Sequence, residues 1–297
     1  MERLTAKDFS PELLDVFDQY VHGDIDRRGF FDRAAKHVAA PLTAAMVLEM
    51  LNPKFAEAQQ VPKDDKRIKT EWVEIDSPKG YGKIKAYVAK PANATGKLPT
   101  VLVIHENRGL NPHIEDIARR LALANFLAVA PDALTPLGGY PSEGEDKARE
   151  LFPKLDQVKT REDFLAATTY ARTRPDSTGK IGAVGFCYGG GMVNFLATRV
   201  PDLAAGVAFY GSAPNLEDVP KIKAALVIQS AETDERINAS WPAYEAALKA
   251  AGKRYEMHRY PSTQHGFNND TTPRFDAAAA DQAWQRTIAF FSSNLRG

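Results

Sequence analysis

Residues 181–191 read Ile-Gly-Ala-Val-Gly-Phe-Cys-Tyr-Gly-Gly-Gly, an apolar strand that ends in Gly-x-Cys-x-Gly and runs into a segment with helical spacing. In a nucleophile elbow the central residue sits on a strained turn, and glycines two before and two after it relieve backbone clashes. The pattern predicts that Cys187 stands at the top of a sheet, where the start of the next helix favours a thiolate and a developing oxyanion. The alternative interpretation is a glycine-rich turn that allows close packing around a buried cysteine.

The segments around this turn alternate between strands and helices. Two alternating runs, 69–75 and 83–89, flank a turn-rich connection and predict an antiparallel hairpin at a sheet edge. Later apolar runs lack alternation, as strands buried on both faces do, so we expect a mostly parallel eight-stranded sheet with helices on both faces. The other predicted strands are 100–104, 127–130, 181–185, 206–210, 225–228 and 255–260, and the predicted helices are 114–124, 161–173, 190–198, 239–250 and 275–295.

Two further residues follow in the order that an α/β-hydrolase requires, an acid after a later strand and a histidine after the last one. Asp234 follows the apolar run 225–230, and His265 follows the last predicted strand. An isolated aspartate in such a loop is usually a turn or capping residue, and Glu232 is a rival for the acid role. The joint order nevertheless predicts a triad of Cys187, Asp234 and His265.

The loop 105–110, His-Glu-Asn-Arg-Gly-Leu, follows the first predicted parallel strand. This fold builds half of its oxyanion hole from a backbone N–H at that point, and the residue after the nucleophile, here Tyr188, supplies the second donor. Charged side chains in such a loop commonly serve solvation alone. Their position beside Cys187 instead indicates a role at the site.

The composition excludes several functional classes. Lys plus Arg and Asp plus Glu both number 38, with no long run of one sign, so no electrostatic footprint for nucleic acid is indicated. The single cysteine rules out an intramolecular disulfide and an all-cysteine metal site. No histidine and carboxylate cluster has the sequence spacing of a metal site, and no cofactor is implied.

The N-terminal 60 residues admit two interpretations. Paired arginines in 26–31, an uncharged stretch at 38–48 and Ala-Glu-Ala at 56–58 resemble a twin-arginine export signal, which would make the protein periplasmic. The other interpretation is a retained helical extension of a cytoplasmic protein, packing on the domain or on a second subunit as a homodimer contact. The uncharged stretch is too short to span a bilayer, which takes about 20 residues, so no integral membrane segment is expected. Polar residues lead into a hydrolase domain at 68–297.

The ordered motifs resemble the dienelactone hydrolase family, whose named activity is carboxymethylenebutenolidase. The resemblance spans residues 71–295. The motifs that carry it are His-Glu-Asn-Arg-Gly-Leu from 105, Ala-Pro-Asp from 130, Gly-Phe-Cys-Tyr-Gly-Gly from 185, Phe-Tyr-Gly from 209, Asp234 with Arg-Ile-Asn from 236, and His-Gly-Phe from 265.

The resemblance implies roles for individual residues. Cys187 is then the nucleophile, His265 the base, Asp234 its orienter and Glu106 a glutamate that contacts the thiol and helps activate it. The backbone N–H groups of Asn107 and Tyr188 form the oxyanion hole. Family members also hold a substrate carboxylate with arginines, whereas the position four after His265 is Asn269. The remaining candidates for substrate contacts are Arg108, Tyr210, Arg236, Phe267 and Arg274.

The expected reaction is hydrolysis of a small ester or lactone through a thioester acyl-enzyme. A thiolate is a good leaving group, so activated esters and enol-lactones suit it better than peptides. The alternative from another class is a thiol-based redox sensor or binding module, in which Cys187 is oxidised or modified. The ordered triad favours catalysis, because a sensor needs neither Asp234 nor His265.

Overall fold

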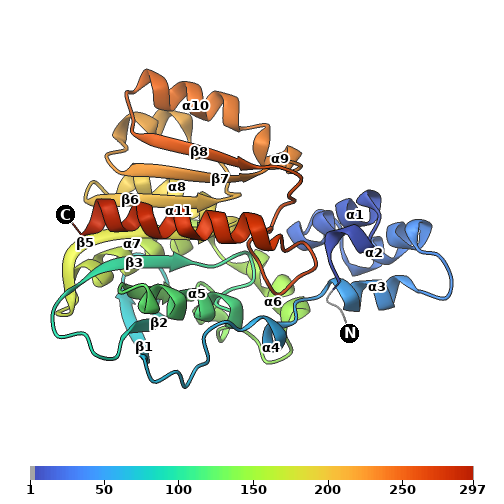
Figure 1. Cartoon of the computed structure of the whole chain (residues 1–297), viewed down its shortest axis with the longest axis horizontal. Helices are drawn as coiled ribbons and strands as arrows, with labels where there is room; N and C mark the ends of the chain where they lie inside the picture. Colours follow the sequence, from blue (N-terminus) through green and yellow to red (C-terminus); the bar gives the residue numbers. More distant parts are fainter. Residues whose placement is uncertain (1–3, 297) are drawn as a thin grey trace.

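The computed structural model describes residues 4–296 and shows one sheet in the order β1-β2-β4-β3-β5-β6-β7-β8 (Figure 1). In that order, every neighbouring pair from β4 through β3 to β8 is parallel. Strand β2 pairs antiparallel with both β1 and β4. The predicted edge hairpin and parallel sheet are therefore confirmed. The strands are β1 (Ile68–Ser77), β2 (Gly82–Pro91), β3 (Leu98–Ile104), β4 (Leu127–Pro131), β5 (Ser177–Phe186), β6 (Leu203–Phe209), β7 (Ala225–Ala231) and β8 (Tyr255–Tyr260).

Helices cover both faces of the sheet. One face packs against α7, α8 and α10, and the other against α5 and α11, so the strands between them are apolar on both sides. The helices are α1 (Pro11–His22), α2 (Arg27–Ala34), α3 (Ala44–Leu51), α4 (Phe55–Ala58), α5 (Pro112–Leu123), α6 (Glu145–Leu151), α7 (Gln157–Thr173), α8 (Tyr188–Arg199), α9 (Glu235–Asn238), α10 (Trp241–Ala250) and α11 (Ala277–Leu295).

Two helical details differ from the expectation. Helix α6 was not predicted, because Ala148 is its only buried residue and a single apolar position leaves no periodic stripe to detect. The predicted helix 239–250 is preceded by the separate short helix α9, which Asp234 begins by accepting a hydrogen bond from Ile237 N–H at 3.3 Å.

The N-terminal segment is a helical appendage, as one interpretation of the sequence predicts. Helices α1 to α3 enclose a small apolar core of their own and lie beside the sheet (Figure 1). Val47 and Leu48, from the uncharged stretch, are buried in that core, and Arg27 and Arg28 open α2. Export through a twin-arginine signal remains a prediction. Within residues 4–296, no helix is long and apolar enough to cross a bilayer.

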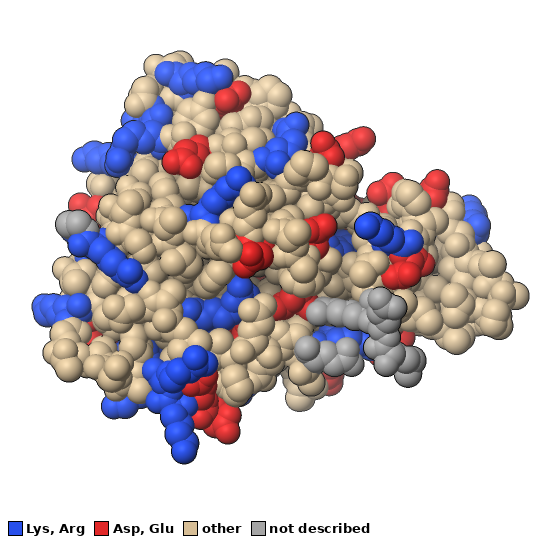
Figure 2. All heavy atoms as spheres, in the orientation of Figure 1, with Lys and Arg blue, Asp and Glu red and all other residues tan. Residues whose placement is uncertain are grey.

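Charged side chains of both signs are interspersed on the face shown in Figure 2. With a formal net charge of +0, the chain has no overall excess of one sign that would attract a polyanion. The visible surface therefore agrees with the charge balance of the sequence.

Candidate active site

Cys187 occupies a sharp turn between β5 and α8, with φ 53° and ψ −112°. The flanking glycines are sterically required there. A Cβ on Gly185 would lie 2.1 Å from the Gly189 carbonyl oxygen, and one on Gly189 would lie 2.2 Å from that of Ile104. Cys187 N–H donates to the Phe209 carbonyl at 3.0 Å, which ties the turn to the neighbouring strand. The elbow geometry predicted for this cysteine is present.

Asp234 and His265 meet at the carboxyl edge of the sheet. His265 Nδ1 lies 2.6 Å from Asp234 Oδ2, and both side chains are buried. The rival Glu232 is exposed and accepts a hydrogen bond from Ser262 N–H at 2.7 Å, away from the imidazole. Asp234, and not Glu232, is therefore the carboxylate bonded to His265, and this bond assigns the Nδ1 proton and leaves Nε2 on the side of the ring away from Asp234.

A second histidine, His22, lies against the thiol. Its Nε2 is 3.5 Å from Cys187 Sγ and 3.3 Å from His265 Nε2. It is the last residue of α1, a helix that Ser10 caps by accepting from Leu13 N–H and that ends before Gly23 at φ 84°. Sequence reasoning missed His22, because no motif connects a histidine in the extension with a cysteine 165 residues further on.

The histidines make the thiol unusually acidic. Burial opposes ionisation of Cys187, but the charge of His265 and hydrogen bonds with His22 and His265 outweigh it and lower the pKa of the thiol to about 5. Burial likewise disfavours an imidazolium at His265, yet the thiolate and the bond to Asp234 raise the pKa of that ring. At neutral pH the geometry thus favours a thiolate facing an imidazolium, the reactive form of a cysteine nucleophile.

The loop after β3 lies beside the nucleophile. Glu106, expected to contact the thiol, instead accepts a hydrogen bond from Asn269 Nδ2 at 2.9 Å, although it lines the same pocket as Cys187. Asn107 turns its side-chain amide to the Val21 carbonyl of α1 at 3.1 Å. The loop is therefore tied on one side to the segment after β8 and on the other to α1.

The first residue of α8 is Tyr188, whose backbone N–H has no carbonyl acceptor within its own helix. This leaves the amide without a helical acceptor beside Cys187, at the position where the sequence predicts an oxyanion donor. The phenol ring of Tyr188 stacks on His105, with centroids 6.4 Å apart and an interplanar angle of 15°. The ring thereby helps hold the start of α8 against the loop after β3.

The three candidate arginines are in different surroundings. Arg108 is buried, and its Nε lies 3.1 Å from a Glu145 oxygen, while burial first and the nearby Arg149 second lower its pKa to about 10. Arg274 donates to Asp18 Oδ1 at 2.9 Å. Both line the pocket at Cys187, whereas Arg236 lies outside the lining. Of the three candidates, Arg108 and Arg274 are thus placed to meet a ligand there, as is Arg149, which the sequence analysis did not identify.

Tyr210 packs its ring against His265, with centroids 4.8 Å apart, at a backbone φ of 37°. Its buried hydroxyl has no hydrogen-bond partner among residues 4–296. Phe267 is fully buried against Tyr210, with centroids 5.6 Å apart, and does not line the pocket. Neither of these two predicted substrate contacts lines the pocket at Cys187. Phe267 packs in the core against Tyr210, and Tyr210 contacts the ring of His265.

A pocket opens at Cys187, between α1, the loop after β3 and the segment after β8. The volume open to water is about 30 Å³, room for about two water molecules. Helix α1 contributes Phe17 and Val21 to its wall. The lining residues are Phe17, Val21, Pro53, Glu106, Asn107, Arg108, Glu145, Arg149, Cys187, His265, Asn269, Thr272 and Arg274.

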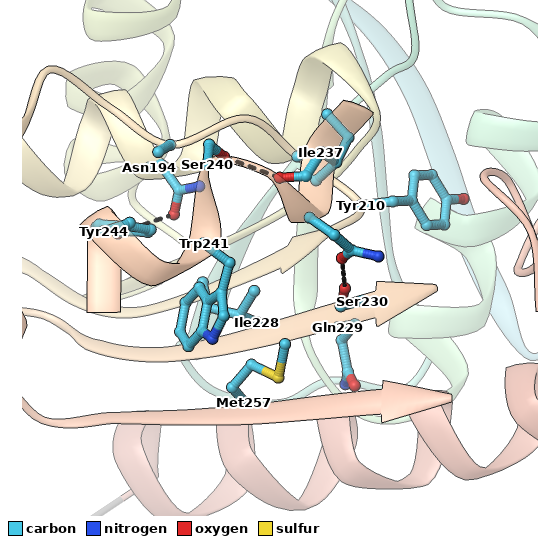
Figure 3. Close-up of a pocket in the computed structure, with 13 residues that line it drawn as sticks. Asn194, Tyr210, Ile228, Gln229, Ser230, Ile237, Ser240, Trp241, Tyr244 and Met257 are labelled. Atoms are coloured by element: carbon cyan, nitrogen blue, oxygen red, sulfur yellow. Dashed lines mark hydrogen bonds between the residues drawn. The ribbon is translucent and has the colours of Figure 1, made fainter. Parts of the chain in front are cut away.

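A second cavity lies behind Tyr210, between β7, α9 and α10 (Figure 3). Its free volume is about 20 Å³, enough for about one water molecule. Figure 3 shows that Tyr210 projects away from the other labelled residues, while Ser230 Oγ donates to Asn238 Oδ1 at 2.6 Å beside the cavity. This cavity holds no predicted nucleophile, so the candidate substrate site is the pocket at Cys187.

Within the described part of the chain, one group of side chains has the composition of a metal site. His22, Cys187 and His265 each offer an atom, and these atoms lie within 4.8 Å of one another. However, an Arg236 guanidinium nitrogen lies 2.8 Å from His22 Nε2, and a cation in that position opposes a second cation. The arrangement fits proton transfer between two imidazoles and a thiol better than metal binding.

Comparison with known proteins identifies the family of this chain. The sequence model described as "Dienelactone hydrolase family" matches residues 84–295, and one described as "YqhI-like" matches residues 1–36. A provisionally named carboxymethylenebutenolidase of Synechocystis is 32% identical over 77% of this chain and 98% of its own length. A provisionally named hydrolase fragment of Escherichia coli, YghX, is 48% identical over 39% of this chain and 97% of its own.

Solved structures show the same architecture. A provisionally named dienelactone hydrolase from Klebsiella pneumoniae superposes with a TM-score of 0.65 at 28% identity, covering 75% of this chain and 99% of that one. The superposition leaves about a quarter of this chain uncovered.

Proposed function

Because the chain belongs to the dienelactone hydrolase family and is an ester or lactone hydrolase of that kind, we propose that it cleaves its substrate through Cys187 and a thioester acyl-enzyme. The observation that carries the proposal is the cysteine elbow beside the Asp234–His265 pair, whose 2.6 Å bond directs the imidazole at the thiol. The narrow pocket at this point favours a small substrate over a large one.

The proposed reaction starts from the ionised thiol. Cys187 thiolate attacks the carbonyl carbon, an S–C bond forms, and the carbonyl π electrons move to oxygen. The N–H groups of Asn107 and Tyr188 stabilise that oxyanion. Collapse breaks the C–O bond to the alcohol, which takes a proton from the His265 imidazolium and leaves a thioester.

Hydrolysis of the thioester completes the cycle. His265 removes a proton from water, the resulting hydroxide attacks the thioester carbonyl, and the C–S bond breaks to release the acid and the thiolate. Because the thiolate leaves more easily than an amide nitrogen, the intermediate formed from a peptide would revert rather than proceed. Esters with good leaving groups and enol-lactones are therefore the proposed substrate class.

Acyl-enzyme trapping tests this proposal. We expect that acid quenching during turnover of 4-nitrophenyl acetate leaves one acetyl group on the Cys187 peptide, detected by mass spectrometry and removed by neutral hydroxylamine. Protein alkylated beforehand with iodoacetamide is the control and should carry no acetyl group. Rapid turnover with no adduct on Cys187, or with the acetyl group on another side chain, would contradict the mechanism.

The pocket wall contributed by α1 should limit the length of the acyl chain. Val21 lines the pocket, and Val16 is equally buried on the same helix but does not. Val21→Ala removes two methyl groups, so we expect the ratio of kcat/KM for 4-nitrophenyl butyrate over acetate to rise by about 10-fold. Val16→Ala is the matched control and should leave the ratio unchanged. Equal ratios in both variants would show that α1 does not bound the acyl site.

A further inference from the structure

Two carboxylate–imidazole pairs converge on one thiol. His265 is held through Nδ1 by Asp234 at 2.6 Å, and His22 is held through Nδ1 by Asp18, at 2.8 Å from its carbonyl and 3.2 Å from its carboxylate. The two Nε2 atoms lie 3.3 Å apart, and the His22 atom is 3.5 Å from Cys187 Sγ. The proposed mechanism uses only the first pair, so the second pair, which α1 supplies, has no assigned role.

Helix α1 is anchored at this position by polar contacts with the hydrolase domain. The Val21 carbonyl, next to His22, accepts from Asn107 at 3.1 Å and from Arg108 at 2.9 Å. Asp18, one turn earlier, accepts from Arg274 at 2.9 Å. The side chain of His22 is only 10% exposed. These contacts place the imidazole against the thiol through the helix backbone.

The hydrogen bonds also assign the tautomer of His22. Asp18 offers only acceptors to Nδ1, so this nitrogen carries the proton of the neutral ring. An Arg236 guanidinium nitrogen, which can only donate, lies 2.8 Å from Nε2. Nε2 is therefore unprotonated in the neutral ring, accepts from Arg236 and lies 3.5 Å from Cys187 Sγ. A hydrogen-bonded carboxylate raises the basicity of an imidazole, as Asp234 does for His265.

We propose that His22 is a fourth catalytic residue, which receives the proton of the His265 imidazolium and passes it to the leaving group; this inference rests on the proposed cysteine mechanism. With Cys187 already ionised, the Nε2–H bond of the His265 imidazolium breaks and an N–H bond forms at His22 Nε2, 3.3 Å away. When the C–O bond of the ester breaks, that proton moves to the departing alkoxide. His265 then remains available as the base for water in the second half of the reaction.

The charges around His22 suit such a transfer. Asp18 on its own helix favours the imidazolium, as does the Cys187 thiolate on the elbow. Arg236 on α9 and a protonated His265 oppose it. A proton held between opposing charges is readily given up to a stronger base, which an alkoxide is.

The test compares His22→Gln with the matched control His37→Gln, an exposed histidine of the same segment. Iodoacetamide alkylation of Cys187 is followed against pH, with EDTA present, alongside kcat and KM for 4-nitrophenyl acetate. We expect the alkylation midpoint of the wild type near pH 5. In His22→Gln we expect it to rise by at least about one pH unit and kcat to fall about 10²-fold with little change in KM. His37→Gln should match the wild type.

Chemical rescue separates catalysis from a structural effect. Added imidazole should restore part of the activity of a His22→Ala variant, because the ring can occupy the vacated space, and should not affect the control. An unchanged alkylation midpoint and kcat in His22→Gln would overturn the role of His22 while leaving the cysteine mechanism intact. Full activity of Cys187→Ala would instead overturn the cysteine mechanism itself.

Discussion

Replacing Cys187 with alanine is expected to reduce hydrolysis of 4-nitrophenyl acetate by at least about 10³-fold. The proposed acyl-enzyme cannot form without the sulfur, and what remains is the oxyanion hole and the pocket acting on free water. The loss should appear in kcat rather than in KM, because the thiol contributes to bond making and little to binding. Cys187→Ala keeps a Cβ at φ 53°, so the strained backbone of the elbow is not changed.

Cys187→Ser is the matched variant, since it replaces sulfur with oxygen at the same position. The serine hydroxyl is far less acidic than a thiol whose pKa lies near 5, and the site is arranged around a thiolate, so we expect this variant also to be strongly impaired. Hydrolysis of a dienelactone, measured in parallel, shows how far the family's substrate preference applies. Wild-type rates in Cys187→Ala, with a normal melting curve, would exclude this cysteine as the nucleophile.

The positions of the triad could be predicted because of the way parallel sheets are built. Cys187, Asp234 and His265 follow the ends of β5 (Phe186), β7 (Ala231) and β8 (Tyr260) within a few residues, and the carboxyl ends of parallel strands meet at one edge. Strand order alone therefore brings residues far apart in sequence into contact. The sequence left Asp234 and Glu232 as alternatives, because a difference of two positions in one loop depends on the turn geometry, which only the structure provides.

The contribution of the N-terminal segment could not be predicted in the same way. Its apolar spacing indicates a helix with a buried face, but no rule of sheet topology says where a separate helical unit docks. The contact of His22 with the thiol follows from that docking. The partner of Glu106 was missed for a similar reason, since its hydrogen bond to Asn269 spans 163 positions and joins two loops.

Asp234→Asn should lower kcat/KM by about 10²- to 10⁴-fold. The asparagine can still accept from His265 Nδ1, but it no longer stabilises an imidazolium, and its amide can also hold the wrong tautomer. The bond to Asp234 is one of the interactions that raise the pKa of His265. Losing it lowers that pKa and weakens the charge that keeps Cys187 ionised, so the pH at which half of the thiol reacts with iodoacetamide should rise together with the loss of activity.

Glu232→Gln makes the same chemical change two residues earlier and is the matched control. Its exposed carboxylate accepts from Ser262 N–H at 2.7 Å and does not touch the imidazole, so we expect both kcat/KM and the alkylation midpoint to match the wild type. Comparable losses in the two variants would mean that the loop responds to any lost charge rather than to the acid of a triad. A loss confined to Glu232→Gln would transfer the acid role to that residue. Only a loss specific to Asp234→Asn, with a shifted thiol titration, supports the assigned order of carboxylate, imidazole and thiol.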